Sequence, residues 1–374
     1  MGFPKTLIEF QEQFPDEASC WQALRLYRWP HGFQCPRCGH CRSYAIADRG
    51  LEQCQRCRYQ ASVTAGTVFH RTRVPLRLWF LGIFFLARHK QGISALQFQR
   101  DTGLGSYQTA WTLLHKLRSA LWHRPESRLQ GWVEADETYV GAEKEKGLRG
   151  GREVGHKTIV AVAVEQRRRT AGSARLAVLE GVSFERDLGP FLRGAIDARK
   201  AVVRTDGFYG YVPLESVGVA HDRHIQGPDR THSAKILPWS HTIFSNLKAW
   251  LHGTFRGVSK KHMPRYLDEF VYRFNRRWRE TELFGFVLRR AVRGHPFPYS
   301  RLTADEMDSS RDSTASTCQS RLAPRMHTGR RNPRCILRRS QWIWRSPFSR
   351  SRCRNTPAEW PSATGSRAGS SRVS

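Results

Sequence analysis

The chain has 374 residues and a formal net charge of +30, and hydrophobic residues make up 39% of it. This length allows two or three modules with a buried core, and this hydrophobic content argues against a wholly disordered protein. An excess of positive charge on this scale favours a polyanionic partner, most commonly nucleic acid. We find no signal-peptide core, and the longest apolar run, 79–87, is too short to cross a bilayer. We therefore expect a cytoplasmic protein without a membrane partner.

The first predicted segment carries a cysteine pattern typical of a zinc ribbon, and we assign residues 1–70 to it. Two Cys-x2-Cys pairs, Cys35 with Cys38 and Cys54 with Cys57, are separated by 15 residues. Four thiolates complete a tetrahedral site, so we predict a structural Zn²⁺ ion. A ribbon has little core of its own, so the metal would largely hold it folded.

Two questions about the ribbon stay open at this stage. Cys41 is an alternative ligand, although it lies outside the pair spacing. Basic side chains surround the two pairs, and in so basic a chain they favour contact with DNA over a purely solvated surface. The residues expected to make this contact are Arg37, Arg56 and Arg58.

Residues 71–125 have helical periodicity, with Pro75 placed to open the first helix. The stretch 93–121 fits two helices joined by a glycine-containing turn, which resembles a helix-turn-helix, with Ser106 capping the second helix. Gln108 would then meet base edges. Three further side chains would reach phosphates: His115, Lys116 and Arg118. An ordinary helical hairpin is the alternative.

Residues 126–295 change to an α/β pattern. The predicted order is strand, strand, strand, helix, strand, helix, helix. The corresponding ranges are 133–140, 158–164, 174–182, 184–196, 201–205, 241–252 and 260–279. We therefore predict an α/β domain after the ribbon and the helical segment.

Acidic residues interrupt two of these apolar strands. Alternation along the first strand places Glu134 and Asp136 on one face and Glu137 on the other. Asp206 ends a later strand. Carboxylates in apolar strands need a compensating positive charge, and a divalent metal is the usual source. If the two strands are neighbours, Asp136 and Asp206 would share Mg²⁺ or Mn²⁺, which activates water or a 3′-hydroxyl to attack a phosphodiester.

The last predicted helix is basic and leads into a different kind of sequence. We expect it to contact the DNA backbone through Lys260, Lys261, Arg273, Arg276 and Arg277. Its acids, Asp268 and Glu269, are rival metal ligands that we interpret as salt-bridge partners of Arg265, Arg273 or Arg276. Residues 296–374 form a basic tail, rich in Arg and Ser, that we predict to be disordered. It is either an arm on DNA or, as we prefer, a non-native extension read through a frameshift.

With these motifs, the chain resembles the DDE-type transposases of insertion sequences that carry an N-terminal zinc ribbon. The resemblance covers roughly residues 15–292. It depends on the two cysteine pairs and on the stretches VEADETYVG, VVRTDGFYGY, HTIFSNLKAWLHGTFRGVSKKH and RYLDEFVYRFNRR. It implies a ribonuclease H-like catalytic core, two divalent metal ions, cleavage at the element ends and strand transfer into target DNA.

The resemblance also assigns roles to individual residues. Asp136 and Asp206 match the first two catalytic carboxylates. The third is usually Glu, and the matching stretch here offers Asn246, with His241 as the alternative. An amide oxygen still ligates a hard cation, although without charge. Lys248 would steady the scissile phosphate as a point charge.

The expected partners follow from the same resemblance. They are double-stranded DNA, both as terminal inverted repeats and as target, and a second copy of the chain; the expected location is the bacterial nucleoid. Three other functions stay open: a DNA-binding regulator without catalysis, a nuclease that cuts without joining, and an inactive transposase remnant.

Overall fold

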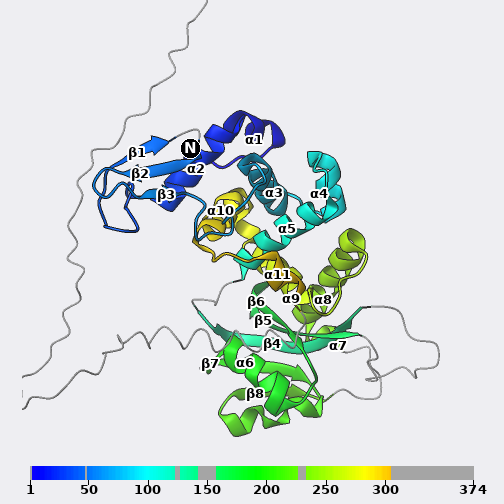
Figure 1. Cartoon of the computed structure of the whole chain (residues 1–374). Helices are drawn as coiled ribbons and strands as arrows, with labels where there is room; N and C mark the ends of the chain where they lie inside the picture. The colour runs from blue at the N-terminus through cyan, green and yellow to red at the C-terminus, as the bar shows by residue number, and fades with distance from the viewer. Residues whose placement is uncertain (1, 47–48, 123–126, 142–156, 226–232, 305–374) are drawn as a thin grey trace, which may run out of the picture.

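The computed structural model of the chain describes residues 2–46, 49–122, 127–141, 157–225 and 233–304. Most of the predicted tail, from residue 305 onward, lies outside the described residues. Figure 1 shows the zinc ribbon with the helices α1–α5 and α10 in one half of the molecule and the larger sheet with α6 and α7 in the other half, while α8 lies beside α9. α9 lies between the two halves.

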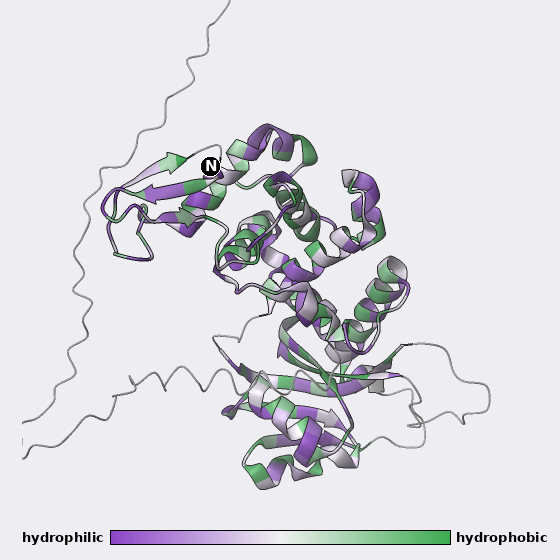
Figure 2. Ribbon diagram, viewed as in Figure 1, coloured by the Kyte–Doolittle hydropathy of each residue, from purple (hydrophilic) through white to green (hydrophobic). Residues whose placement is uncertain are grey.

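The N-terminal part contains two helices that the sequence patterns did not predict. α1 (Leu7–Gln13) is capped by Thr6, and α2 (Glu17–Arg28) begins with a capping box between Asp16 and Ser19. β1 (Ser43–Ile46), β2 (Leu51–Cys54) and β3 (Gln60–Ser62) then form an antiparallel sheet. These strands are too short to enclose a core, and Figure 2 shows hydrophilic residues along much of β2.

Three helices follow the ribbon: α3 (Leu76–Arg88), α4 (Ala95–Thr102) and α5 (Tyr107–Leu121). Ser94 and Ser106 cap α4 and α5, so the predicted cap at Ser106 is confirmed. Gly103 ends α4 in the left-handed conformation, with φ of +67°. α4 packs against α5, which gives the predicted hairpin of helices joined by a glycine turn.

The larger sheet contains five strands in the order β6-β5-β4-β7-β8. β4 (Leu129–Val140), β5 (Thr158–Arg167) and β6 (Thr170–Leu179) are antiparallel neighbours, whereas β7 (Ile196–Asp206) and β8 (Ala220–His224) run parallel to β4. The mixed sheet is flanked by helices, which confirms the predicted α/β fold class. β8 lies between the predicted strand 201–205 and the predicted helix 241–252, where no element was predicted, and it is a strand because it pairs with β7.

Helices cover both faces of this sheet. One face packs on π-helical η2 (Phe184–Leu188), α6 (Gly189–Ala195) and 3-10-helical η3 (Tyr209–Val217). The other face packs on α8 (Pro238–Trp250) and α9 (Met263–Phe274). α7 (Ser233–Ile236) precedes α8, which continues into the π-helical turn η5 (Leu251–Phe255). α8 therefore begins three residues before the predicted start.

The end of the described chain returns to the N-terminal helices. After 3-10-helical η6 (Arg277–Glu282), α10 (Leu283–Arg293) packs on α2, α3 and α5, and Phe284 joins a cluster with Phe10, Phe14 and Phe80. One core thus crosses the predicted boundary between residues 125 and 126. α11 (Tyr299–Thr303) lies inside the segment predicted as tail. None of the described helices is both long and apolar enough to span a membrane.

Candidate active site and zinc site

The two strand aspartates lie side by side in the sheet. β4 pairs with β7 in parallel, and Glu134 is in register with Arg204. Two residues further along each strand, the same register places Asp136 beside Asp206, where β7 ends. Neighbouring strands are about 4.8 Å apart, so the two side chains start within reach of one ion.

Both aspartates face the α8 side of the sheet. Val133 and Ala135 of β4 and Val203 of β7 belong to the core on the α6 side. Because side chains alternate along a strand, Asp136 and Asp206 point the other way. Glu137 returns to the α6 side, where its Oε2 accepts a hydrogen bond of 2.7 Å from the Tyr211 hydroxyl. The alternation predicted for β4 is therefore found.

The electrostatics of Asp136 fit a divalent cation. Burial, followed by the nearby charges of Glu137 and Asp206, raises the pKa of Asp136 well above its usual range. The protein alone therefore disfavours two ionised aspartates at this place, and a cation between them would compensate both charges. Asp206 is fixed in part by its Oδ1, which accepts a hydrogen bond from the backbone N–H of Phe208 at 3.0 Å.

Glu134 positions α8 over this site, a role that sequence reasoning missed. Its carboxylate is buried, and Oε2 accepts hydrogen bonds of 2.9 Å from the backbone N–H groups of Trp239 and Ser240. These groups are the unsatisfied donors of the first turn of α8. The N-terminus of a helix thus compensates part of the charge of Glu134, whereas its other oxygen, Oε1, is buried without a hydrogen-bond partner in the described chain. Pro238 at the helix start is the sequence signal that could have marked this terminus, although the predicted helix begins at residue 241.

His241 and Lys248 are the residues of α8 that approach the aspartates. His241 Nε2 lies 3.9 Å from Asp136 Oδ2. Burial and the charge of Lys248 lower the pKa of His241, whereas Asp206 acts to raise it. Lys248 Nζ donates a hydrogen bond of 2.8 Å to the Thr138 hydroxyl, two residues beyond Asp136. Four groups thus converge: two aspartates, one imidazole and one ammonium.

Asn246, which was predicted as the third catalytic residue, lies on a different face of α8. It follows His241 by five residues, a rotation of about 140° around the helix. Its side chain lines a groove together with Arg88 and Arg273. The structure therefore does not bring Asn246 to the aspartates, whereas it does bring His241, the alternative left open by the sequence.

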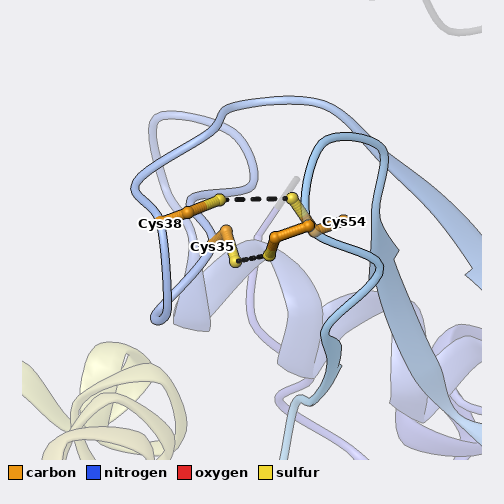
Figure 3. A group of neighbouring side chains, drawn as sticks. Cys35, Cys38 and Cys54 are labelled. Atoms are coloured by element: carbon orange, nitrogen blue, oxygen red, sulfur yellow. Dashed lines mark hydrogen bonds between the residues drawn. The ribbon is translucent and has the colours of Figure 1, made fainter.

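The four predicted zinc ligands meet in the ribbon. One ligand atom from each of Cys35, Cys38, Cys54 and Cys57 lies within 4.8 Å of the others. The sulfur of Cys38 is 3.6 Å from that of Cys54, and the other two sulfurs are also 3.6 Å apart (Figure 3). Two tight turns, one from each pair, present the thiols to each other, which is the arrangement of a structural Zn²⁺ site.

The pKa shifts of two of these thiols also fit a bound cation. Although burial opposes it, hydrogen bonds from the backbone N–H groups of Cys57 and Arg56 lower the pKa of Cys54 to about 7. The N–H of His40 favours the Cys38 thiolate, yet burial and the neighbouring sulfurs raise the pKa of Cys38 to about 12. The neighbouring sulfurs thus oppose a second thiolate, and a cation bound between them would offset this effect.

Some of the predicted DNA-contacting residues are exposed, whereas others are buried or bonded within the protein. Arg37, Arg56 and Arg58 are exposed on the ribbon, Gln108 is exposed at the start of α5, and Lys116 is half-buried. Lys260 is exposed and forms an ion pair with Glu180, while Lys261 Nζ donates to the Thr303 carbonyl at 2.9 Å. The three ribbon arginines and Gln108 are thus exposed to a partner.

Arg118 corrects the prediction for the helical segment. Its side chain is only 1% exposed, and its Nε lies 2.7 Å from Oε2 of the buried Glu269. An arginine enclosed in this way cannot reach a phosphate. His115 is also buried, between Trp111 and Tyr266, so its predicted phosphate contact is corrected for the same reason.

The basic patch predicted on the last helix is largely turned into the protein. Arg273 donates to the carbonyls of His89 and Lys90 and pairs with Glu269 at 3.4 Å. Arg277 donates to the carbonyl of Ala171, and the guanidinium of Arg276 lies 3.9 Å from the centre of the Tyr272 ring. The predicted ion pairs of the two acids are confirmed, since Asp268 pairs with Arg265 and Glu269 with Arg273.

Comparison with known proteins finds family matches over the regions that contain the two sites. An ISXO2-like transposase domain matches residues 128–275, and a transposase zinc-ribbon domain matches residues 15–60. The chain is also 29% identical, over 290 residues, to a Halobacterium salinarum protein described as an uncharacterized protein in transposable element ISH50. That similarity covers 70% of this chain and 91% of the other protein. The first match contains both strand aspartates and α8, and the second contains the four clustered cysteines.

Proposed function

Because the chain belongs to the insertion-sequence transposases with an N-terminal zinc ribbon, we propose that it catalyses divalent-metal-dependent cleavage at insertion-sequence ends and transfer of the cut strand into target DNA. The observation that carries this proposal is the parallel register of β4 and β7. It sets Asp136 beside Asp206 on the face that α8 covers. Such paired carboxylates are the ligands that Mg²⁺ or Mn²⁺ takes in phosphoryl-transfer sites.

We assign the third position of the site to His241. It is the α8 side chain with a nitrogen close to an Asp136 oxygen, and it is 40% exposed. Imidazole is a softer ligand than carboxylate, so we expect weaker binding of Mg²⁺ than a third acid would give. When bound, the metal supplies Lewis-acid activation of the attacking oxygen and of the scissile phosphate.

Lys248 has a separate role in the proposed reaction. The Thr138 hydroxyl holds its ammonium next to the aspartates, and burial lowers the pKa of Lys248, followed by the charge of Lys157. Its remaining N–H donors can hold a phosphate oxygen of the scissile group as a point charge. The exposed arginines of the ribbon supply further attraction to double-stranded DNA, and we propose that two or more copies of the chain act on paired element ends.

The proposal is tested with purified protein, labelled element ends, target plasmid and Mg²⁺. Asp206→Ala should keep the DNA affinity of the unchanged protein and lose both cut and joined products. His241→Ala should lower the cleavage rate by about 100-fold, and added metal should restore part of that loss, because one ligand is missing. His241→Glu should retain cleavage because a carboxylate is a harder ligand.

Asn246→Ala is the matched control on the same helix, and it should cleave like the unchanged protein. A loss of cleavage in this variant, together with an active His241→Ala, would return the third position to Asn246. Cut ends without joined product would support the alternative function of a nuclease that cuts DNA without joining it. DNA binding without any cleavage by the unchanged protein would support the regulator or the inactive remnant and would end the proposal of catalysis.

A further inference from the structure

A polar groove lies where the helix-turn-helix-like segment meets the chain that follows α8. Its volume is about 630 Å³. One wall comes from α4 and the start of α5, and the other comes from η5 and the loop that leads to α9. Two segments separated by about 150 residues in the sequence thus form a single surface.

The lining of this groove is positive and offers many hydrogen-bond donors. Arg100 projects from α4 and Arg256 from the loop after η5, and both side chains are exposed. Ser259 and His262 add polar groups, and Tyr107, 52% exposed, adds a hydroxyl. No aspartate or glutamate of the described chain lines the groove. An anion is the ligand that such a lining recognises.

The two arginines differ from the others nearby. Arg118 and Arg273 are neutralised by the buried Glu269. Within the described ranges, no ion pair is formed by Arg100 or Arg256. The closest acid in sequence, Asp101, instead accepts a hydrogen bond of 2.6 Å from Gln97. Two uncompensated guanidinium groups thus face the same groove.

The backbone at Arg256 gives the loop a defined shape. Arg256 has φ of +56° and Gly257 has φ of +122°, so the chain turns sharply where η5 ends. The left-handed conformation favours glycine, and a bulky residue there is uncommon in proteins. Arg256 lies at this turn and lines the groove.

α8 connects the groove with the proposed active site. Its first turn is held by Glu134 beside the aspartates, and its last turn leads into η5 and Arg256. From His241 to Arg256 the helix rise amounts to about 20 Å. One strand of B-DNA advances 3.4 Å per nucleotide, so this span corresponds to about six nucleotides.

We propose that this groove binds the sugar-phosphate backbone of the DNA about six nucleotides from the scissile phosphate. Arg100 and Arg256 make the phosphate contacts. The groove would join the base-reading start of α5 to the catalytic domain through one DNA strand. The distance to the scissile phosphate depends on the proposed function, whereas binding of the backbone does not.

The first test measures affinity for double-stranded DNA against salt concentration, using the full chain and its double variant Arg100→Gln, Arg256→Gln. Loss of two phosphate contacts should reduce the slope of log affinity against log salt by about 1.8. The ratio of the DNA affinity of the unchanged protein to that of the variant should therefore fall about tenfold as salt rises from about 50 to about 200 mM. An unchanged slope would overturn the proposal.

Two controls separate the groove from charge in general and from catalysis. Arg186→Gln with Arg193→Gln removes two exposed arginines from the opposite side of the sheet, and its salt slope should equal that of the unchanged protein. If the salt slope of this control falls by the same amount, the effect comes from non-specific charge and not from the groove, and the proposal is overturned. Asp206→Ala should keep the full slope. If the unchanged protein does not cleave but the groove variant still loses slope, the groove stands and the catalytic proposal fails.

The position of the contact is tested with single neutral methylphosphonates placed along a labelled element end. In the unchanged protein, affinity should drop most at a phosphate about six nucleotides from the cleavage site. In the double variant this drop should disappear, while drops at other positions remain. A profile identical in both proteins would overturn the assignment of Arg100 and Arg256 to that phosphate.

Discussion

His115 lies fully buried against Trp111, with the ring centres 4.0 Å apart, and its Nε2 is 3.5 Å from the Tyr266 hydroxyl. Burial, followed by the charges of Arg118, His262 and Arg265, lowers the pKa of His115 to about 2. The imidazole is therefore neutral in the folded protein, and its function is packing. At this scale, enclosure decides the role of a side chain that its residue type alone would assign to DNA.

This burial makes a prediction about pH. The pKa is depressed in the folded state, so the unfolded chain binds an extra proton below about pH 6.5, and stability falls as pH falls towards 2. The slope of unfolding free energy against pH measures how many more protons the unfolded state binds. In His115→Phe, this number should fall by about one between about pH 6 and pH 4. Urea unfolding at several pH values measures this slope. The exposed His252→Phe should behave like the unchanged protein, and equal slopes in all three proteins would refute the prediction.

The element with the least core of its own is the ribbon. Its buried cluster contains Phe33, Cys35, Cys54 and Ala61, and two of these are zinc ligands. β1–β3 therefore depend on the metal more than on apolar burial. α8 shows the opposite case, since a buried carboxylate fixes its start and apolar side chains fix its length against the sheet.

Removing one ligand should unfold the ribbon and leave the rest of the chain folded. We expect Cys54→Ser to lose its zinc in gel-filtered protein, and residues 29–62 to become sensitive to protease. Cys20→Ala is the matched control, because Cys20 is buried in the helical core outside the cluster. It should retain one zinc per chain. Full zinc content in Cys54→Ser, measured by elemental analysis, would contradict this assignment of ligands.

At the scale of the whole molecule, a buried charge network joins the helical segment to the α/β domain. Glu269 of α9 lies between Arg118 of α5 and Arg273, and Arg118 also stacks 4.3 Å from the centre of the Tyr266 ring. Together with the packing of α10 on α3 and α5, this network fixes the orientation of the α4–α5 hairpin relative to the proposed active site.

Breaking this network should destabilise the protein. Arg118→Met leaves Glu269 with one partner, and we expect the free energy of unfolding to fall by about 3 kcal/mol. The double variant Arg118→Met, Glu269→Met should recover part of this loss, because no buried carboxylate remains short of a partner. Arg279→Met, in the exposed pair with Glu282, should change stability little. Equal losses in Arg118→Met and Arg279→Met would show that burial of the pair is not decisive.

Local sequence was enough to predict the features that depend on neighbouring residues. The spacing of the cysteine pairs predicted the ribbon, and the alternation in β4 placed Asp136 on the face opposite Glu137. Ser106 marked the start of α5, and the acids in apolar strands marked the site. These features were predictable because caps, turns and strand alternation are set within a few residues.

The tertiary structure alone decided what depends on distant partners. β8 is a strand because β7 pairs with it, Glu134 caps α8 across about 100 residues, and Arg118 is enclosed by Glu269. The choice between His241 and Asn246 also needed the rotation of α8, which packing against the sheet determines. Sequence thus determined which chemical groups the protein has, and long-range packing decided which of them face the proposed metal, the DNA or the core, because burial is a property of the assembled fold.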